Sequence, residues 1–227
     1  MSRASSICDR VYAVGGPGLS APEDACVYLV DAESEMVMID AGVGRGLGRI
    51  EENIRSLGFE PARIWHVVAT HCHIDHIGGL AALQERYGSK VIAHELDRSG
   101  VEGENSDLTA AAMYGVDYRP VKVDVLLKGD CEPLTLGDLE FNFLHTPGHT
   151  PGSICVYIDT ADGRVLFGQD IHGPFSPAWG SDMAQWRRSM ERLLALRADV
   201  LCEGHSGVYK GKRIEKYIQG YLERYRT

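Results

Sequence analysis

Six consecutive residues, His71-Cys72-His73-Ile74-Asp75-His76, constrain this sequence more than any other feature. They contain four side chains that can ligate a metal ion, and they follow an apolar run at 64–70 that is typical of a buried strand. A lone histidine is usually an ordinary core or surface residue. Four ligand-type side chains packed into six residues after a buried strand instead predict a metal centre, held in a loop at the end of that strand.

Three further donors come later in the chain, and each follows a strand-like run: His149, Asp170 and His205. Together with His71, His73, Asp75 and His76 they make five imidazoles and two carboxylates. This set exceeds the three protein ligands plus water that one catalytic zinc ion takes. It suits two divalent metal ions that share a bridging carboxylate. Without thiolate ligands, the expected metals are zinc first, with iron or manganese as alternatives.

Short apolar runs and amphipathic helical patterns occur in both halves of the chain, so we expect one domain over residues 1–227. The pattern predicts two β-sheets packed face to face with helices outside. Strands are predicted at 11–14, 26–30, 36–39, 64–70, 90–93, 139–144, 153–158, 164–167 and 200–202. Helices are predicted at 46–58, 79–87, 182–196 and 214–225, with Ser181 as the N-cap of the third.

The segment 100–124 is rich in turn residues and has a short helical patch at 108–114. It is either an excursion that covers the site like a lid or an ordinary surface connection. His172, two residues past Asp170, is a candidate for the wall of the pocket. Tyr114, Phe175 and Trp179 would shape an apolar cleft or simply pack under a loop. The side chain of Cys72 is expected to point away from the ligands that flank it.

Composition narrows the class of partner. A net charge of −9 disfavours nucleic acid and anionic membrane surfaces, so the expected partner is a small-molecule substrate. The sequence shows no signal-peptide pattern and no apolar run of about 18 residues that would suit a transmembrane helix. Its six cysteines are scattered without a CxxC pair, which predicts reduced thiols and a cytoplasmic location. The oligomeric state stays open, with a homodimer among the candidates.

These segments resemble the metallo-β-lactamase superfamily. THCHIDHIGG resembles its defining motif, and TPGHTPGS, GQD and EGH resemble its later ligand segments in the same order. The resemblance covers nearly the whole chain and implies an α/β, four-layer αββα sandwich of two mixed β-sheets with helices on the outer faces. It also implies a second-sphere role for Asp40, in the segment IDAG, as the group that orients a ligand histidine. The implied ligands are His71, His73 and His149 for the first metal, Asp75, His76 and His205 for the second, and Asp170 as the bridge.

The resemblance also narrows the reaction. True β-lactamases of the superfamily lack the bridging aspartate, so Asp170 indicates the glyoxalase II-like branch of thioesterases, lactonases and persulfide dioxygenases. The first hypothesis is a hydrolase in which a bridging hydroxide of the dinuclear site attacks an ester, thioester or lactone carbonyl. Asp75 or Asp170 would be the catalytic residue that accepts or shuttles the proton.

Two alternatives remain open. A mononuclear iron persulfide dioxygenase would bind its metal through His71, His149 and Asp170. The other alternative belongs to a different class, a non-catalytic, metal-containing binding protein.

Overall fold

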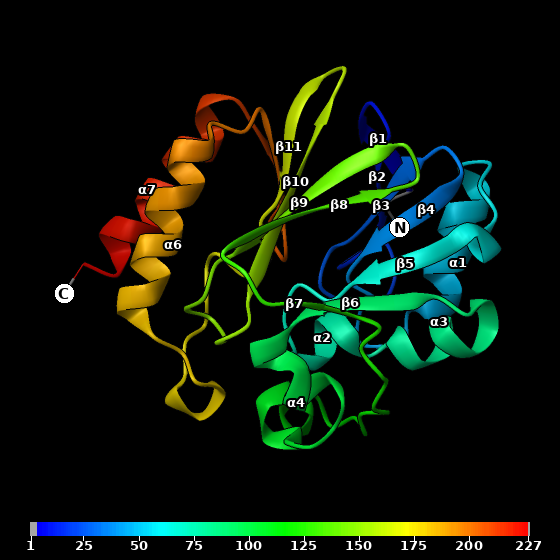
Figure 1. The fold of residues 1–227 in the computed structure, drawn as a ribbon, viewed down its shortest axis with the longest axis horizontal. Helices are drawn as coiled ribbons and strands as arrows, with labels where there is room; N and C mark the ends of the chain where they lie inside the picture. Colours follow the sequence, from blue (N-terminus) through cyan, green and yellow to red (C-terminus); the bar gives the residue numbers. More distant parts are fainter. Residues whose placement is uncertain (1–3, 227) are drawn as a thin grey trace.

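Two β-sheets packed face to face, with helices on both outer faces, form the molecule (Figure 1). The computed structural model describes residues 4–226. Apolar side chains from both sheets, among them Val37, Val68, Phe141 and Phe167, fill the space between the sheets and are buried. The predicted four-layer αββα sandwich is confirmed.

The first sheet contains seven strands, in the same order in space as in the chain. The first four pair in antiparallel fashion, and β4 to β7 are parallel. Parallel neighbours end at one edge of a sheet, so the loops after β4, β5 and β6 meet there. The strands are β1 (Ser5–Cys8), β2 (Val11–Gly15), β3 (Val27–Ala32), β4 (Glu35–Ile39), β5 (Ile64–Val68), β6 (Lys90–His94) and β7 (Val125–Leu127).

The second sheet is built from the rest of the chain and has the order β13-β12-β11-β10-β9-β8. All of its pairs are antiparallel except β11 with β12. Because β11 and β12 run in the same direction, the loops that follow them lie side by side. The strands are β8 (Cys131–Leu136), β9 (Leu139–His145), β10 (Ile154–Thr160), β11 (Gly163–Phe167), β12 (Val200–Glu203) and β13 (Gly207–Lys210).

The long helices cover the sheets with their apolar faces. Helices α1 (Leu47–Ser56) and α3 (Leu80–Tyr87) pack on the first sheet, and α6 (Met183–Leu196) and α7 (Lys212–Arg224) pack on the second (Figure 1). Within residues 4–226, none of the helices combines the length and apolar character that crossing a bilayer requires. The short elements are α2 (Ile74–Ile77), α4 (Arg98–Val101), α5 (Ala111–Tyr114), η1 (Pro61–Arg63), η2 (Glu95–Asp97), η3 (Ser106–Thr109) and η4 (Pro177–Trp179).

All nine predicted strands and all four predicted helices are present, and the structure adds β1, β7, β8 and β13. The predicted N-cap of α6 is wrong. The cap is Asp182, whose Oδ1 accepts hydrogen bonds from the backbone N–H groups of Ala184 and Gln185. A carboxylate reaches both of these free N–H groups at once, whereas the Ser181 hydroxyl donates to the carbonyl of His149 instead.

Candidate metal centre

Seven histidine and aspartate side chains converge at the edge of the molecule where strands of both sheets end. The first sheet contributes His71, His73, Asp75 and His76 through the loop after β5 and helix α2. The second contributes His149 after β9, Asp170 after β11 and His205 after β12. All are buried except His205, whose side chain is 28% exposed. The structure therefore brings together every residue that the sequence predicted as a metal ligand.

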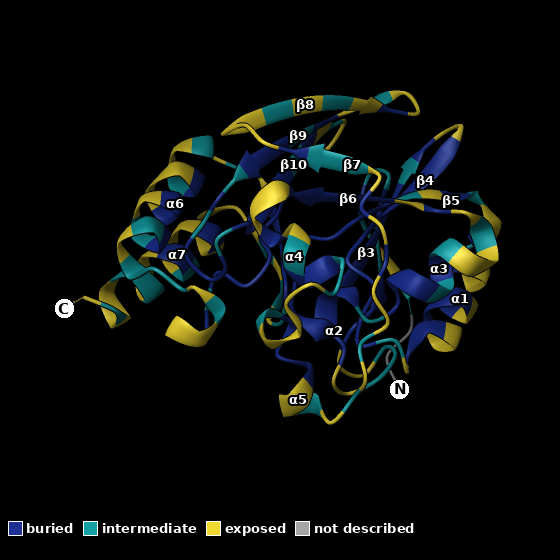
Figure 2. Ribbon diagram, turned by 60° about the horizontal axis from the view of Figure 1, so that its bottom comes forward, coloured by how far each residue is buried: buried dark blue, intermediate teal, exposed yellow. Residues whose placement is uncertain are grey.

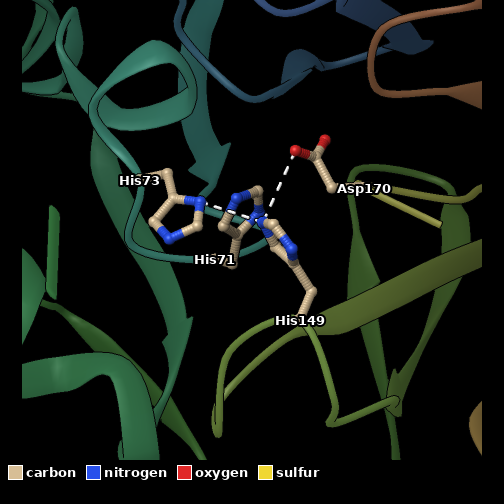
Figure 3. Close-up of side chains that lie close together, drawn as sticks. All are labelled: His71, His73, His149 and Asp170. Carbon is tan, nitrogen blue, oxygen red and sulfur yellow. Dashed lines mark hydrogen bonds and ion pairs between the residues drawn. The ribbon is translucent and has the colours of Figure 1, made fainter. Parts of the chain in front are cut away.

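The first group contains His71, His73, His149 and Asp170, with donor atoms within 4.8 Å of one another (Figure 3). Nδ1 of His73 lies 2.9 Å from Nε2 of His149. Nδ1 of His149 lies 2.8 Å from the carbonyl oxygen of Pro174 and donates to it. This bond leaves a lone pair on Nε2 of the neutral ring, directed into the group. Nε2 of His71 is buried and makes no hydrogen bond.

The second group contains Asp75, His76 and His205. Nε2 of His205 lies 3.2 Å from Oδ2 of Asp75 and 3.4 Å from Nε2 of His76. Nδ1 of His76 lies 2.8 Å from Oδ2 of Asp40, which accepts its proton. This bond directs Nε2 of His76 towards the carboxylates of Asp75, 3.7 Å away, and Asp170, 3.1 Å away.

Asp170 lies between the two groups. Its Oδ1 is 3.1 Å from Nε2 of His76 and 3.2 Å from Nε2 of His205, and its Oδ2 is 3.5 Å from Nε2 of His149. Oδ1 is buried and makes no hydrogen bond. Imidazole and carboxylate groups buried this close together fit divalent cations. One aspartate in contact with both groups fits two neighbouring ions.

The pKa values in the first group favour metal binding. Burial, together with His149 beside it, lowers the pKa of His73 to about 3. Burial likewise lowers the pKa of His71 well below its usual value. These rings are therefore neutral at pH 7, the form in which imidazole ligates a metal.

The carboxylates near the second group favour the protonated form of its histidines. Burial opposes the charged form of His205, but Asp170 and Asp75 outweigh it and raise its pKa to about 10. Asp170 itself has a pKa well below its usual value, because His76 and His205 outweigh the effect of its burial. A metal cation would satisfy the same carboxylates that hold these protons.

Asp40 supports the second group, at the position where the sequence placed it. Its side chain accepts hydrogen bonds from Nδ1 of His76, at 2.8 Å, and from the backbone N–H of Thr70, at 2.9 Å. The backbone of Asp40 is left-handed, with φ of 61°. Such a conformation costs energy for a residue other than glycine, so the surrounding contacts must hold it in place.

Asp97 is a supporting residue that the sequence analysis missed. It is buried at the end of η2, just past β6. Its Oδ2 accepts hydrogen bonds from the backbone N–H of Cys72, at 3.0 Å, and from Oγ1 of Thr150, at 2.7 Å. Its Oδ1 accepts from the backbone N–H of Gly152, at 2.6 Å. Asp97 therefore ties the first ligand loop to the loop that carries His149. Its place beyond a parallel strand, like that of Asp40, is a signal that could have identified it.

Gly152 has to be a glycine for this contact. A Cβ atom there would lie 2.5 Å from the backbone nitrogen of Asp97 and 2.6 Å from its Oδ1. Such distances are too short for any side chain, so the close approach of the two loops depends on this glycine.

His172 lies beside the centre without belonging to either group. Its Nδ1 is 3.0 Å from Oε1 of the buried Glu203, and its ring centroid is 5.2 Å from that of His205. The side chain of Cys72 is buried, and its Sγ donates to the carbonyl of Leu108 rather than joining the donor groups.

Aromatic side chains flank the first group. The ring centroid of Trp179 lies 4.7 Å from that of His73, and that of Phe175 lies 6.1 Å from that of His149. Tyr114 packs against a small apolar cluster that includes Ile74, and burial together with the charge of Asp75 raises the pKa of its hydroxyl. Tyr114 comes from the segment 100–124, for which the sequence left open a lid or an ordinary surface connection.

The chain is similar to several known proteins. Residues 22–205 match the family model described as the metallo-beta-lactamase superfamily. The probable metallo-hydrolase YqgX of Bacillus subtilis is 32% identical over 151 residues, which cover 64% of this chain and 68% of that protein. The acyl-coenzyme A thioesterase MBLAC2 of Bos taurus is 27% identical over an alignment of 249 positions, covering 96% of this chain and 86% of that protein.

Among solved structures, the subclass B3 metallo-beta-lactamase BJP-1 of Bradyrhizobium japonicum has a TM-score of 0.83 at 25% identity. The match covers 99% of this chain and 92% of that one.

Proposed function

The chain belongs to the metallo-beta-lactamase superfamily, and we propose that it is a dinuclear hydrolase that cleaves an ester, thioester or lactone bond. The observation that carries this proposal is the position of Asp170, whose oxygens lie within 3.5 Å of histidines from both donor groups. A carboxylate in this position can serve two ions at once.

Each side chain has a part in this proposal. His71, His73 and His149 would hold one divalent ion, and Asp75, His76 and His205 the other, with Asp170 shared. Bound zinc would supply a nucleophile from water at neutral pH and would polarise the carbonyl of the substrate. The two donor groups contain no carboxylates other than Asp75 and Asp170. We therefore propose that one of these two side chains accepts the proton that the water releases.

Two observations favour a thioester, ester or lactone over a β-lactam. Asp170 lies within 3.5 Å of histidines from both donor groups, as a bridging ligand of the glyoxalase II-like branch would. In addition, the relative MBLAC2, which aligns with nearly the whole chain, is named as a thioesterase. The likeness to BJP-1 supports the fold and leaves the choice of substrate to the site.

The test combines elemental analysis with a substrate panel. Protein purified without added metal is analysed for zinc, iron and manganese, then loaded with zinc and assayed on thioesters, esters, lactones and a β-lactam. We expect two zinc ions per chain and hydrolysis of at least one thioester or ester. We expect both zinc stoichiometry and activity to fall in Asp170→Asn. The matched control is Asp159→Asn, an exposed aspartate that pairs with Arg164 far from the donor groups.

Other outcomes would replace the proposal. One iron ion per chain, with oxygen consumption on a persulfide, would identify a dioxygenase. A metal-loaded protein that cleaves no member of the panel would indicate a metal-containing binding protein. Cleavage of the β-lactam alone would reject the proposed branch.

A further inference from the structure

A groove lies beside the first donor group, between the segment 103–120 and η4. Its volume is about 530 Å³, within the size range of small-molecule sites. The walls are mainly apolar. They include Ala110, Ala111, Met113, Val116, Tyr118 and Trp179. The short helix α5, which contributes to one wall, lies at the surface of the molecule (Figure 2).

Trp179 lies beside both this groove and the first donor group. Its ring centroid lies 4.7 Å from that of His73 and 6.3 Å from that of His149, in an edge-on and a tilted arrangement respectively. The same side chain lines the groove. A molecule that reacts at the first donor group therefore has an apolar surface within reach on this side.

The charges of the groove restrict what can occupy it. The charged side chains that line it are Asp107 and Asp117, and its lining contains no lysine or arginine. An anionic group would be repelled by these carboxylates and would find no cation to pair with. An uncharged apolar group would instead cover Met113, which is 71% exposed and is flexible enough to adapt to different occupants.

We propose that the groove binds the apolar acyl chain of the substrate. This inference rests on the proposed hydrolase function and names the class of substrate, an ester or thioester of an uncharged, medium-length acyl group. Of the two arms of such a substrate, the acyl arm fits because it carries no charge. An anionic leaving group would meet Asp107 and Asp117.

The experiment measures chain-length dependence. Zinc-loaded protein is assayed on p-nitrophenyl esters from acetyl to octanoyl. We expect kcat/KM to rise about threefold to fourfold for each added methylene until the groove is filled. In Trp179→Ala and Met113→Glu the ratio of octanoyl to acetyl activity should collapse, whatever happens to the acetyl activity itself. Trp65→Ala is the control for loss of a tryptophan, because Trp65 lies on β5 and is 52% exposed.

A second readout does not require turnover. Calorimetry compares the binding of two methyl ketones in the wild type and the three variants. Heptyl methyl ketone carries the octanoyl chain, and acetone is its acetyl counterpart. We expect the octanoyl compound to bind more tightly, with the difference lost in Trp179→Ala and Met113→Glu. Equal binding of both ketones, or a chain-length ratio unchanged in these two variants, would overturn the assignment of the groove. Preferential octanoyl binding without hydrolysis of any ester, thioester or lactone would instead overturn the proposed function.

Discussion

Asp97 holds two ligand loops together, so replacing it with asparagine tests whether the first donor group depends on this support. Its carboxylate accepts three hydrogen bonds, from Cys72, Thr150 and Gly152. Asparagine has the same shape but only one acceptor oxygen, and its NH₂ group faces a donor in either orientation. The backbone N–H of either Cys72 or Gly152 therefore loses its acceptor.

The loss of stability in Asp97→Asn depends on whether each of the three donors has another acceptor. Oγ1 of Thr150 can still bond to Oγ of Ser153, 2.8 Å away. The backbone N–H groups of Cys72 and Gly152 have no such alternative among the hydrogen bonds of residues 4–226. Leaving one buried donor unsatisfied costs about 1–3 kcal/mol. Loss of a residue that supports metal ligands typically lowers metal affinity by about 10- to 100-fold. We expect both effects in Asp97→Asn.

The assay measures zinc affinity by competition with a chromophoric chelator, and stability by urea unfolding of the metal-free protein. Glu35→Gln is the matched control, because Glu35 is also a buried carboxylate and accepts from the backbone N–H of Gly137 at 2.8 Å. Glu35 is the first residue of β4, whereas Asp40 and the donor groups lie beyond the last residue of that strand. Glu35 is therefore remote from the metal ligands. Glu35→Gln should lose stability and keep its zinc affinity. If Asp97→Asn also keeps wild-type zinc affinity while losing stability, the reasoning about the ligand loops is wrong.

Three other perturbations test separate parts of the structure. Removal of metal with a chelator should lower the unfolding temperature measured by calorimetry, because metal at about 100 times its Kd adds about 2.7 kcal/mol of stability. An unchanged unfolding temperature would contradict a metal bound among these donors. Asp40→Asn should weaken one of two zinc equivalents by about tenfold in a titration. The two oxygens of Asp40 accept separately from Nδ1 of His76 and from the backbone N–H of Thr70, and asparagine keeps only one acceptor oxygen. Equal loss at both equivalents would contradict this assignment. Burial and the adjacent His145 lower the pKa of His94 from 6.5 to about 4, so between these values the unfolded chain binds a proton that the folded protein does not. Stability should therefore fall as the pH drops from 6.5 towards 4, by at most about 3 kcal/mol, and urea unfolding of His94→Gln should show a flatter pH profile. The same profile in both proteins would show that His94 is not responsible.

The strands that the sequence did not reveal share one property. β1, β7, β8 and β13 are the four edge strands of the two sheets. Edge strands are short or half exposed, so they lack the continuous apolar run that marks a central strand. β8 illustrates this, because its residues alternate between exposed and partly buried along most of its length and include Pro133. Proline is tolerated at an edge but argues against a strand when only the sequence is read.

The donor residues were predictable for a different reason. Four of them lie within six positions, so their chemistry is visible without any knowledge of the fold. Asp97 is 25 positions from Cys72 and 53 from Thr150, and only the packed structure shows that it contacts both. The predicted cytoplasmic location and the homodimer stay predictions.

Within residues 4–226 the chain passes from the first sheet to the second once, between β7 and β8, at residues 128–130. Every donor before this point comes from the first sheet and every donor after it from the second, so neither part carries a complete set. A protein expressed as two chains divided at this connection would be joined by the apolar layer between the sheets and by zinc. Its assembly would then depend on the concentration of free zinc as well as on that of the fragments. The strand order thus provides a site at which this protein can be converted into a zinc-responsive pair of complementing fragments.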